Sequence, residues 1–304
     1  MNVLSLFDGM SCGQIALERV GIKVDNYYAS EIDEYAIKVA KVNYPNTKHV
    51  GSVVNVKAPT NIDLLIGGSP CQGFSFAGKQ LNFDDPRSAL FFEYVRLLNE
   101  CKPKYFLLEN VNMKQEYQDV ITSYLGVKPI KINSSLVSAQ NRIRLYWTNI
   151  LDVDQPEDKG LLLQDVLEND YADRDKSFCL DANYFKGGNL KSYFEKHRRQ
   201  LVFSKNGLCH VGDADLKGND SIKRVYHREG KAPTLTTMGG GHREPKVLLD
   251  LNSYRKLTPL ECERLQTVPD NYTAHVSNTQ RYKMLGNGWT VDVIAHIFKG
   301  LKNE

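Results

Sequence analysis

Cys71 is the residue of this chain whose setting most suggests chemistry. It lies in the run Ser-Pro-Cys-Gln-Gly-Phe-Ser at 69–75, directly after the apolar segment 62–66, which is typical of a buried strand. Pro70 has a fixed φ angle and biases Ser69 toward extended geometry, so we expect a turn that holds Cys71 at the carboxyl edge of a sheet. A thiolate there could act as a nucleophile. An isolated cysteine is more often a small buried hydrophobe, so the choice depends on the other motifs.

Six further motifs follow in a definite order along the chain. They are Phe7-Asp8-Gly9-Met10-Ser11-Cys12-Gly13, Glu31-Ile32-Asp33, Glu109-Asn110-Val111, Gln140-Asn141-Arg142-Ile143-Arg144, Arg255-Lys256-Leu257-Thr258-Pro259-Leu260-Glu261 and Leu285-Gly286-Asn287-Gly288. Each motif alone is a weak signal, but their order over nearly the whole chain resembles the cytosine-5 DNA methyltransferase family. The phrase Gly78-Lys79-Gln80 is similar to bacterial and phage members, whereas Gly288-Trp289-Thr290-Val291 is closer to mammalian de novo enzymes.

The resemblance implies a set of catalytic residues. Adding a thiolate to carbon 6 of cytosine makes carbon 5 nucleophilic, and carbon 5 can then attack an electrophilic methyl group. Cys71 is the expected nucleophile, and Glu109 is the carboxyl group expected at nitrogen 3 and the exocyclic amine of the base. We expect the planar donor fork of Arg142 to orient the carbonyl of the base or Glu109 itself. Arg144 is expected to do the same or to bind phosphate.

The methyl donor that the resemblance implies is S-adenosylmethionine. The small-residue turn after the first strand is expected to let the backbone approach this cofactor closely. Glu31, at the end of the second strand, is expected to accept hydrogen bonds from both ribose hydroxyls. The expected cofactor-binding residues are Phe7, Asp8, Gly9, Gly13, Glu31, Ile32, Ser52, Pro70, Asn287 and Trp289.

Two of these positions depart from the family's pattern. Ser52 stands where the family usually carries an acidic residue for the adenine amine, and its hydroxyl can accept a hydrogen bond only without the help of charge. Trp289 replaces a smaller residue that is common in bacterial members, so we expect an altered pocket or a simply packed aromatic ring. Asn287 resembles the family's late asparagine near the amino-acid end of the donor.

A cytosine inside a duplex cannot reach such a cysteine, so the resemblance also implies base flipping. The loop 72–86 is expected to close over DNA, and a basic region is expected to read the sequence. Residues 183–246 contain 13 Lys and Arg and 6 Asp and Glu, a local net charge of +7 in a chain of net charge +3. This favours a polyanion partner, the alternative being a solvated surface with a chance excess of charge. The expected DNA contacts are Gln72, Ser75, Gln80, Arg87, Arg224, Arg228, Thr234 and Arg243.

The bulk properties indicate a soluble globular protein, with 41% hydrophobic and 25% charged residues. No apolar run is long enough to span a membrane, and the N-terminus lacks the basic start of a secretory signal. Six cysteines without a CxxC pair fit reduced thiols, and no histidine has zinc-finger spacing, so we expect no metal site. We expect a cytoplasmic protein of a bacterium or a phage-infected host, associated with the nucleoid.

The hydrophobic pattern predicts an α/β fold. In the first 150 residues, strands are expected at 3–7, 26–30, 62–66 and 105–108, and helices at 14–20, 34–43, 88–100 and 115–125. Such alternation indicates a parallel sheet covered by helices, and the resemblance implies the Rossmann-like sheet of S-adenosylmethionine-dependent methyltransferases. Residues 130–137 and 145–148 are expected to close its edge as an antiparallel hairpin.

The chain is expected to leave this sheet and return to it. We predict a catalytic and cofactor-binding domain from residues 1–172 and 253–304, and a smaller, loop-rich target-recognition domain from 173–252. The C-terminal helices, one of them capped by Thr258 with Glu261 three residues later, are expected to pack on the first domain.

The expected partner is double-stranded DNA, bound by a monomer that contacts no membrane, and a cognate restriction endonuclease encoded nearby is compatible with the resemblance. Two alternatives stay open. One branch of the family uses the same motifs on transfer RNA. A DNA-binding regulator on a decayed scaffold is the other, although the loss of Cys71, Glu109 or Arg142 that would mark it is not seen.

Overall fold

The computed structural model describes residues 1–69, 89–203 and 254–302, together with the backbone of three short strands at 210–213, 224–227 and 246–248. Several of the expected site residues lie outside the described residues, namely Pro70, Cys71, Gln72, Ser75, Gln80, Arg87, Arg228, Thr234 and Arg243. Arg224 is described by its backbone alone.

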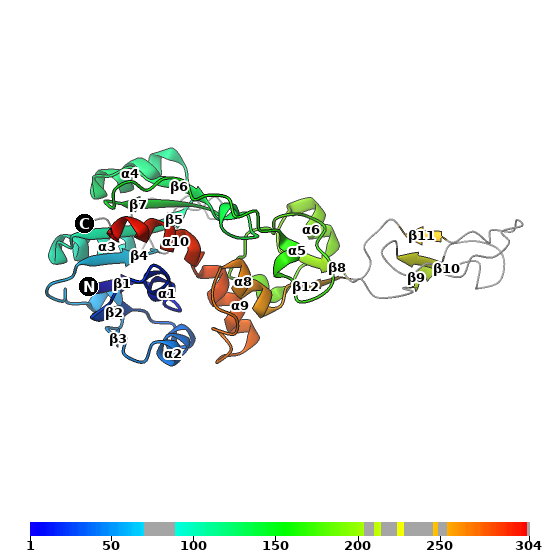
Figure 1. The fold of residues 1–304 in the computed structure, drawn as a ribbon, viewed down its shortest axis with the longest axis horizontal. Helices are drawn as coiled ribbons and strands as arrows, with labels where there is room; N and C mark the ends of the chain where they lie inside the picture. The colour runs from blue at the N-terminus through cyan, green and yellow to red at the C-terminus, as the bar shows by residue number, and fades with distance from the viewer. Residues whose placement is uncertain (70–88, 204–209, 214–223, 228–245, 249–253, 303–304) are drawn as a thin grey trace, which may run out of the picture.

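A seven-stranded sheet in the order β3-β2-β1-β4-β5-β7-β6 forms the centre of the molecule (Figure 1). Its strands are β1 (Asn2–Leu6), β2 (Asn26–Ser30), β3 (Lys48–His49), β4 (Leu64–Gly67), β5 (Tyr105–Val111), β6 (Ile130–Asn133) and β7 (Ile143–Thr148). The first five pair in parallel, whereas β7 runs antiparallel to both β5 and β6. The expected parallel sheet with an antiparallel hairpin at its edge is therefore confirmed.

Helices cover both faces of this sheet. In the first half of the chain they are α1 (Cys12–Arg19), α2 (Glu34–Asn43), α3 (Ala89–Cys101) and α4 (Gln115–Leu125), with short 3-10 turns η1 (Val53–Asn55) and η2 (Ser134–Leu136). Because successive strand side chains point to opposite faces, Leu64 and Ile66 belong to one buried core and Leu65 to another. The first core includes residues of α1, and the second includes residues of α3 and α4.

The C-terminal helices return to the sheet, as expected. They are α8 (Pro259–Leu265), α9 (Asn278–Asn287) and α10 (Val291–Phe298), followed by the 3-10 turn η4 (Lys299–Lys302). Thr258 caps α8 in the expected way: its hydroxyl accepts from the backbone N–H of Glu261, whose carboxylate accepts from the N–H of Thr258. The helix α10 packs against α1 and carries six side chains of the first core. The segment before it, residues 286–290, is thereby fixed beside the carboxyl edge of the sheet.

Short helices and strands lie between the last strand of the large sheet and the C-terminal helices. They are α5 (Leu163–Val166), η3 (Tyr184–Lys186), α6 (Leu190–Lys196), β8 (Leu201–Phe203), β9 (His210–Asp213), β10 (Arg224–His227), β11 (Lys246–Leu248) and β12 (Tyr254–Lys256). The strands β8 and β12 pair antiparallel, and β9 to β11 form a separate small sheet that lies away from the large one (Figure 1). Helix α6 was not expected, because seven residues are too few to show a helical period; Asn189 starts it by accepting from the N–H of Ser192.

Among the residues that the structure describes, no helix has the length and apolar character needed to cross a membrane.

Candidate active site

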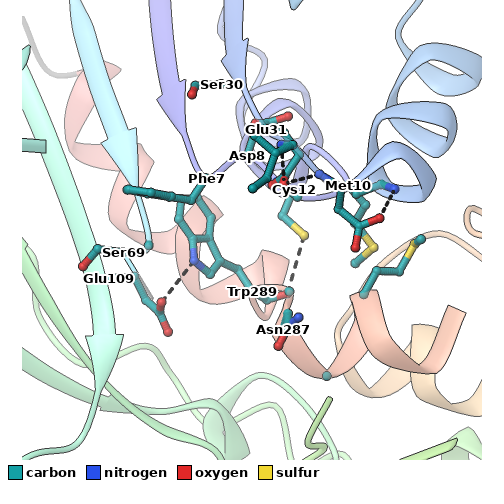
Figure 2. Close-up of a pocket in the computed structure, with 18 of the residues that line it drawn as sticks. Phe7, Asp8, Met10, Cys12, Ser30, Glu31, Ser69, Glu109, Asn287 and Trp289 are labelled. Carbon is teal, nitrogen blue, oxygen red and sulfur yellow. Dashed lines mark hydrogen bonds between the residues drawn. The ribbon is translucent and has the colours of Figure 1, made fainter. Parts of the chain in front are cut away.

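A pocket of about 460 Å³ lies at the carboxyl ends of β1, β2, β4 and β5 (Figure 2). Open α/β sheets bind their ligands at this edge. The end of α9 and the loop after it, from the C-terminal part of the chain, also line the pocket. Eleven of the expected site residues line it together: Phe7, Asp8, Gly9, Glu31, Ile32, Ser52, Glu109, Arg142, Arg144, Asn287 and Trp289.

The turn after β1 brings backbone N–H groups to the pocket. Phe7, Gly9 and Ser11 have φ angles of 56°, 58° and 64°. Glycine adopts this left-handed conformation at little cost, whereas the side chains of Phe7 and Ser11 disfavour it. The turn therefore stores backbone strain at these two residues. The N–H of Gly9 points at Oε2 of Glu31, 2.8 Å away. A turn of this shape holds the carboxylate of the second strand against the first.

Gly13 lies in the packing between α1 and the sheet. It is not among the residues that line the pocket, and it lies in α1 where that helix crosses the sheet. A Cβ atom on Gly13 would lie 2.4 Å from Cδ1 of Ile66 and 2.8 Å from the hydroxyl of Tyr27. Its small size therefore allows close helix–sheet packing, and its expected approach to the cofactor stays a prediction.

Glu31 is fixed by three backbone N–H groups. Its Oε1 accepts from Ile32 at 2.7 Å and from Asp33 at 2.8 Å, while Oε2 accepts from Gly9. This arrangement holds the carboxylate in one orientation and leaves lone pairs for a ligand with adjacent hydroxyls. The side chain of Ile32 beside it is 78% exposed, an unusual position for a large apolar group, and it lines the same pocket as Ser52.

Asp8 is a buried acid beneath this turn. Its carboxylate accepts from the hydroxyl of Tyr27 at 2.7 Å and from the hydroxyl of Ser11. Burial raises the pKa of the Asp8 carboxyl to about 6, and the nearby charge of Glu31 adds to this rise against the opposing hydrogen bonds. Asp8 thus helps to shape the turn through hydrogen bonds made within the protein.

Glu109, two residues before the end of β5, is held at both of its carboxylate oxygens. Arg144 on β7 places its Nε atom 3.0 Å from Oε1, and the indole Nε1 of Trp289 donates to Oε2 at 3.2 Å (Figure 2). The pair is largely buried, with 15% of the Arg144 side chain and 12% of the Glu109 side chain exposed. The charge of Glu109 is therefore compensated within the pocket rather than by solvent.

Arg142 does not contact Glu109, although that contact was one of its two expected roles. Arg142 is only 3% exposed, and its guanidinium donates to the carbonyls of Leu180 at 3.0 Å, Gly286 at 3.2 Å and Gly288 at 2.9 Å. Backbone carbonyls that end α9 lack partners within the helix and attract such a donor fork. The expected contact with Glu109 belongs to Arg144, and Arg142 holds the loop that carries Asn287 and Trp289.

Other residues of this support escaped the sequence analysis. Gln266 donates to the carbonyl of Leu285 at 2.6 Å, and its side-chain oxygen accepts from the hydroxyl of Thr290 at 2.9 Å. Ser134 donates in turn to the Thr290 hydroxyl. Their signal in sequence is weak, because isolated Gln, Thr and Ser residues are common on surfaces. Lys283 pairs with Asp33 at 2.8 Å between residues that line the pocket, which no motif suggested.

Cys179 is a second unexpected neighbour. Its sulfur lies 3.4 Å from Nη1 of Arg142 and 4.0 Å from Nη2 of Arg144. Burial alone would raise the pKa of this thiol, but the two guanidinium charges hold it below its ordinary value.

The chain enters the Cys71 loop directly beside Glu109. A Cβ atom on Gly68 would lie 3.0 Å from Oε2 of Glu109 and from Nε1 of Trp289, so a larger residue would require these side chains to shift. The next residue, Ser69, is buried and its hydroxyl accepts from the side-chain amide of Asn110 at 3.4 Å. Cys71 follows two residues later and lies outside the described part of the chain.

A sheet of this order, with its pocket at the carboxyl edge, defines a Rossmann-like α/β enzyme fold. The chain belongs to the C-5 cytosine-specific DNA methylase family, whose family model matches residues 1–124 and 132–303. The predicted enzyme class, a DNA cytosine-5 methyltransferase, is confirmed by this membership.

Relatives match the chain over nearly all of its length. The type II methyltransferase M.HhaI of Haemophilus parahaemolyticus is 30% identical over 98% of this chain and 93% of its own. The orphan methyltransferase M.SPBetaI of Bacillus phage SPbeta is 28% identical over 99% of this chain and 97% of its own. Among solved structures, the methyltransferase EhMeth of Entamoeba histolytica shares the fold with a TM-score of 0.69 and 18% identity, over 100% of this chain and 99% of its own.

Proposed function

We propose that this protein transfers a methyl group from S-adenosylmethionine to carbon 5 of a flipped cytosine in a short duplex DNA site, through a covalent adduct with Cys71. The observation that carries the proposal is the continuity of one pocket, which runs from the fixed carboxylate of Glu31 to the doubly held carboxylate of Glu109. The first end suits a nucleoside with two hydroxyls, and the second suits the polar edge of a base.

The residues present fit the proposed cofactor. Glu31 offers lone pairs to ribose hydroxyls, and Ile32 and Phe7 offer apolar surface to a nucleoside ring. Ser52 would meet the adenine without charge, and Asn287 lies at the other side of the pocket, where a polar end group would fall. S-adenosylmethionine, when bound, supplies an electrophilic methyl group on a sulfonium centre.

The proposed roles of the protein's own residues follow from the chemistry of cytosine. The Cys71 thiolate adds to carbon 6, which gives carbon 5 enamine character. The carboxyl group of Glu109 shares a proton with nitrogen 3 as negative charge builds on the ring, and it accepts a hydrogen bond from the exocyclic amine. Arg144 keeps this carboxyl group oriented toward the base. Methyl transfer leaves S-adenosylhomocysteine as the neutral thioether. Carbon 5 then loses its proton to solvent and the bond between sulfur and carbon 6 breaks, which releases the methylated base and the Cys71 thiolate.

We infer that double-stranded DNA is the substrate, because the chain belongs to the C-5 cytosine-specific DNA methylase family and because residues 183–246 are basic. A monomer in a bacterial or phage-infected cytoplasm, with or without a cognate restriction endonuclease, fits such an enzyme. The recognition segment is proposed within the basic region. Tyr254 of β12 pairs with Phe203 of β8, which supports a segment that leaves and returns at one place.

The test of the proposal combines activity and target sequence. Plasmid from a host that expresses the protein should show protected cytosines at one short motif after bisulfite sequencing. Tritium from labelled S-adenosylmethionine should enter duplex DNA and not transfer RNA. Unprotected plasmid together with labelled transfer RNA would replace the DNA proposal with the RNA alternative.

The role of Cys71 has its own test. Cys71→Ala should abolish transfer and leave DNA binding in place, because only the nucleophile is removed. The wild-type protein should form a stable covalent adduct with DNA that carries 5-fluorocytosine, since fluorine blocks the proton loss that releases the enzyme. Transfer by the Cys71→Ala variant would show that the proposed mechanism is wrong.

The recognition segment can be tested by exchange. The expected target-recognition domain, 173–252, includes two supports of the catalytic part: the carbonyl of Leu180 accepts from Arg142, and the Tyr184 hydroxyl accepts from the N–H of Leu257 at 2.9 Å. An exchange of that whole domain would disturb these supports. Exchange of residues 204–253, between β8 and β12, should keep the enzyme folded and transfer the methylation pattern of the donor. An active hybrid with the original pattern would contradict the assignment.

A further inference from the structure

We propose that Trp289 is a positioning residue for the methyl transfer: its indole N–H fixes Oε2 of Glu109 so that the carboxylate keeps one orientation in the pocket. This inference rests on the proposed function, in which Glu109 meets the polar edge of the base. It assigns a role to Trp289, which stands where the sequence departs from the expected smaller residue.

The geometry supplies a two-point grip. Arg144 holds Oε1 from one side at 3.0 Å and Trp289 holds Oε2 from the other at 3.2 Å. The terminal torsion of a glutamate is broad and roughly two-fold, so a single contact would leave the carboxylate free to rotate. Two donors on different oxygens restrict this rotation. Each carboxylate oxygen also keeps a second lone pair that can accept from a base.

The indole can act as a fixed donor because its backbone is anchored on both sides. The carbonyl of Trp289 lies 3.9 Å from the sulfur of Cys12 (Figure 2). The carbonyl of Gly288 accepts from Arg142. Thr290 is held by Gln266. A Cβ atom on Gly288 would lie 2.9 Å from Cε of Met10, so the loop lies close to the turn after β1. Arg142 thus acts on Glu109 indirectly, through the loop that carries Trp289.

Space for the indole is also built into the chain. Gly68 leaves room for both Glu109 and Trp289, since a Cβ atom there would lie 3.0 Å from each of the two hydrogen-bonded atoms. In Figure 2 the indole points toward Glu109, and the dashed line joins the two side chains. The contact therefore depends on residues from three separated parts of the chain, at 68, 109 and 289.

The matched comparison uses the two tryptophans of the chain. Trp147 lies in the core and donates to the hydroxyl of Thr122 at 3.1 Å. Trp289→Phe and Trp147→Phe make the same chemical change, so each removes one indole N–H and keeps an aromatic ring. We expect Trp289→Phe to lower the single-turnover rate of methyl transfer about 10- to 100-fold, the loss typical of a hydrogen bond to a charged group, with KM for S-adenosylmethionine changed less than about threefold. Trp147→Phe should leave the rate of the folded protein unchanged.

A double-mutant cycle separates positioning from a structural role. If Trp289 acts through the carboxylate, Trp289→Phe should change the residual rate of a Glu109→Gln protein less than about threefold. An equal loss in both backgrounds would overturn the proposal, and so would a loss confined to KM.

The contact itself can be read without activity. In proton–nitrogen spectra of the full chain, Trp147→Phe identifies the indole signal of Trp289, which should shift in Glu109→Gln while the Trp147 signal does not. An unshifted Trp289 signal would overturn the proposal. If the signal shifts in Glu109→Gln but the wild-type protein transfers no methyl group, the contact is present and the proposed function is contradicted.

Discussion

Glu109 and Arg144 are diagonal neighbours on one face of the antiparallel pair β5–β7. Glu109 lies opposite Tyr146 and Arg144 lies opposite Val111, so the carboxylate and the guanidinium are offset by two residues on the same side of the sheet. Diagonal side chains of this kind are about 7–8 Å apart at their origins, a distance that a long arginine can span. The register of one strand pair thus decides which arginine of the motif at 140–144 holds the carboxylate.

Replacing Arg144 by lysine should lower the rate of methyl transfer by about 10²-fold, because a lysine offers a point charge where the planar Nε donor fixes one oxygen of Glu109. The measurement is the single-turnover rate with saturating cofactor and DNA. Arg264→Lys is the matched control, since Arg264 forms an exposed pair with Asp270. Equal activity of the two variants would contradict a role for Arg144 in the site.

Arg142→Met should act first on stability. The substitution removes three hydrogen bonds from a charged donor to the carbonyls of Leu180, Gly286 and Gly288, at a cost of about 3 kcal/mol in the free energy of unfolding. Urea denaturation measures this change as a lower midpoint with an unchanged slope. A variant as stable as the wild type would show that the carbonyls find other partners.

Gly286→Ala should be strongly destabilising, because a Cβ atom there would lie 2.3 Å from the carbonyl carbon and oxygen of Asp181. These are backbone atoms, so the helix α9 and the segment before η3 must separate, at a cost of about 1–3 kcal/mol or more. Gly126→Ala is the comparison: its φ is +71° but nothing lies within 4 Å, so we expect a cost of only about 1 kcal/mol. Thermal unfolding of both variants checks the order.

The buried carboxyl of Asp8 should make stability depend on pH. Its pKa is about 6 in the folded protein and near 3.8 in the unfolded chain, so the folded state binds the proton more tightly. The resulting stabilisation is complete below pH 3.8, is lost as the pH rises to 6 and stays lost above it, a change of at most about 3 kcal/mol.

An Asp8→Asn protein lacks this titration. The difference in unfolding free energy between wild type and Asp8→Asn should therefore shift against the wild type as the pH is raised from 4.5 to 7. A difference that is the same at every pH would mean that Asp8 titrates alike in both states.

The local sequence determined the elements and the edge at which they carry chemistry. The bounds of β2, α2 and α4 agree with the expected ranges 26–30, 34–43 and 115–125, because Gly126 and the residues before Pro45 end these helices through local backbone chemistry. Glu31 and Glu109 were expected at strand ends, and parallel strands bring their carboxyl ends to one edge. The motif order was enough to indicate the family.

Only the tertiary structure decided which side chains meet. The indole of Trp289 contacts a carboxylate 180 residues away, and Lys283 pairs with an acid 250 residues away. Gly13 serves helix packing and Arg142 serves a loop, although both lie in motifs that suggested contact with a ligand or with Glu109. Such contacts depend on the return of α9 and α10 to the sheet and on the register of β5 with β7. Neither is encoded in the local periodicity of apolar residues, since both arise when distant segments bury their surfaces together.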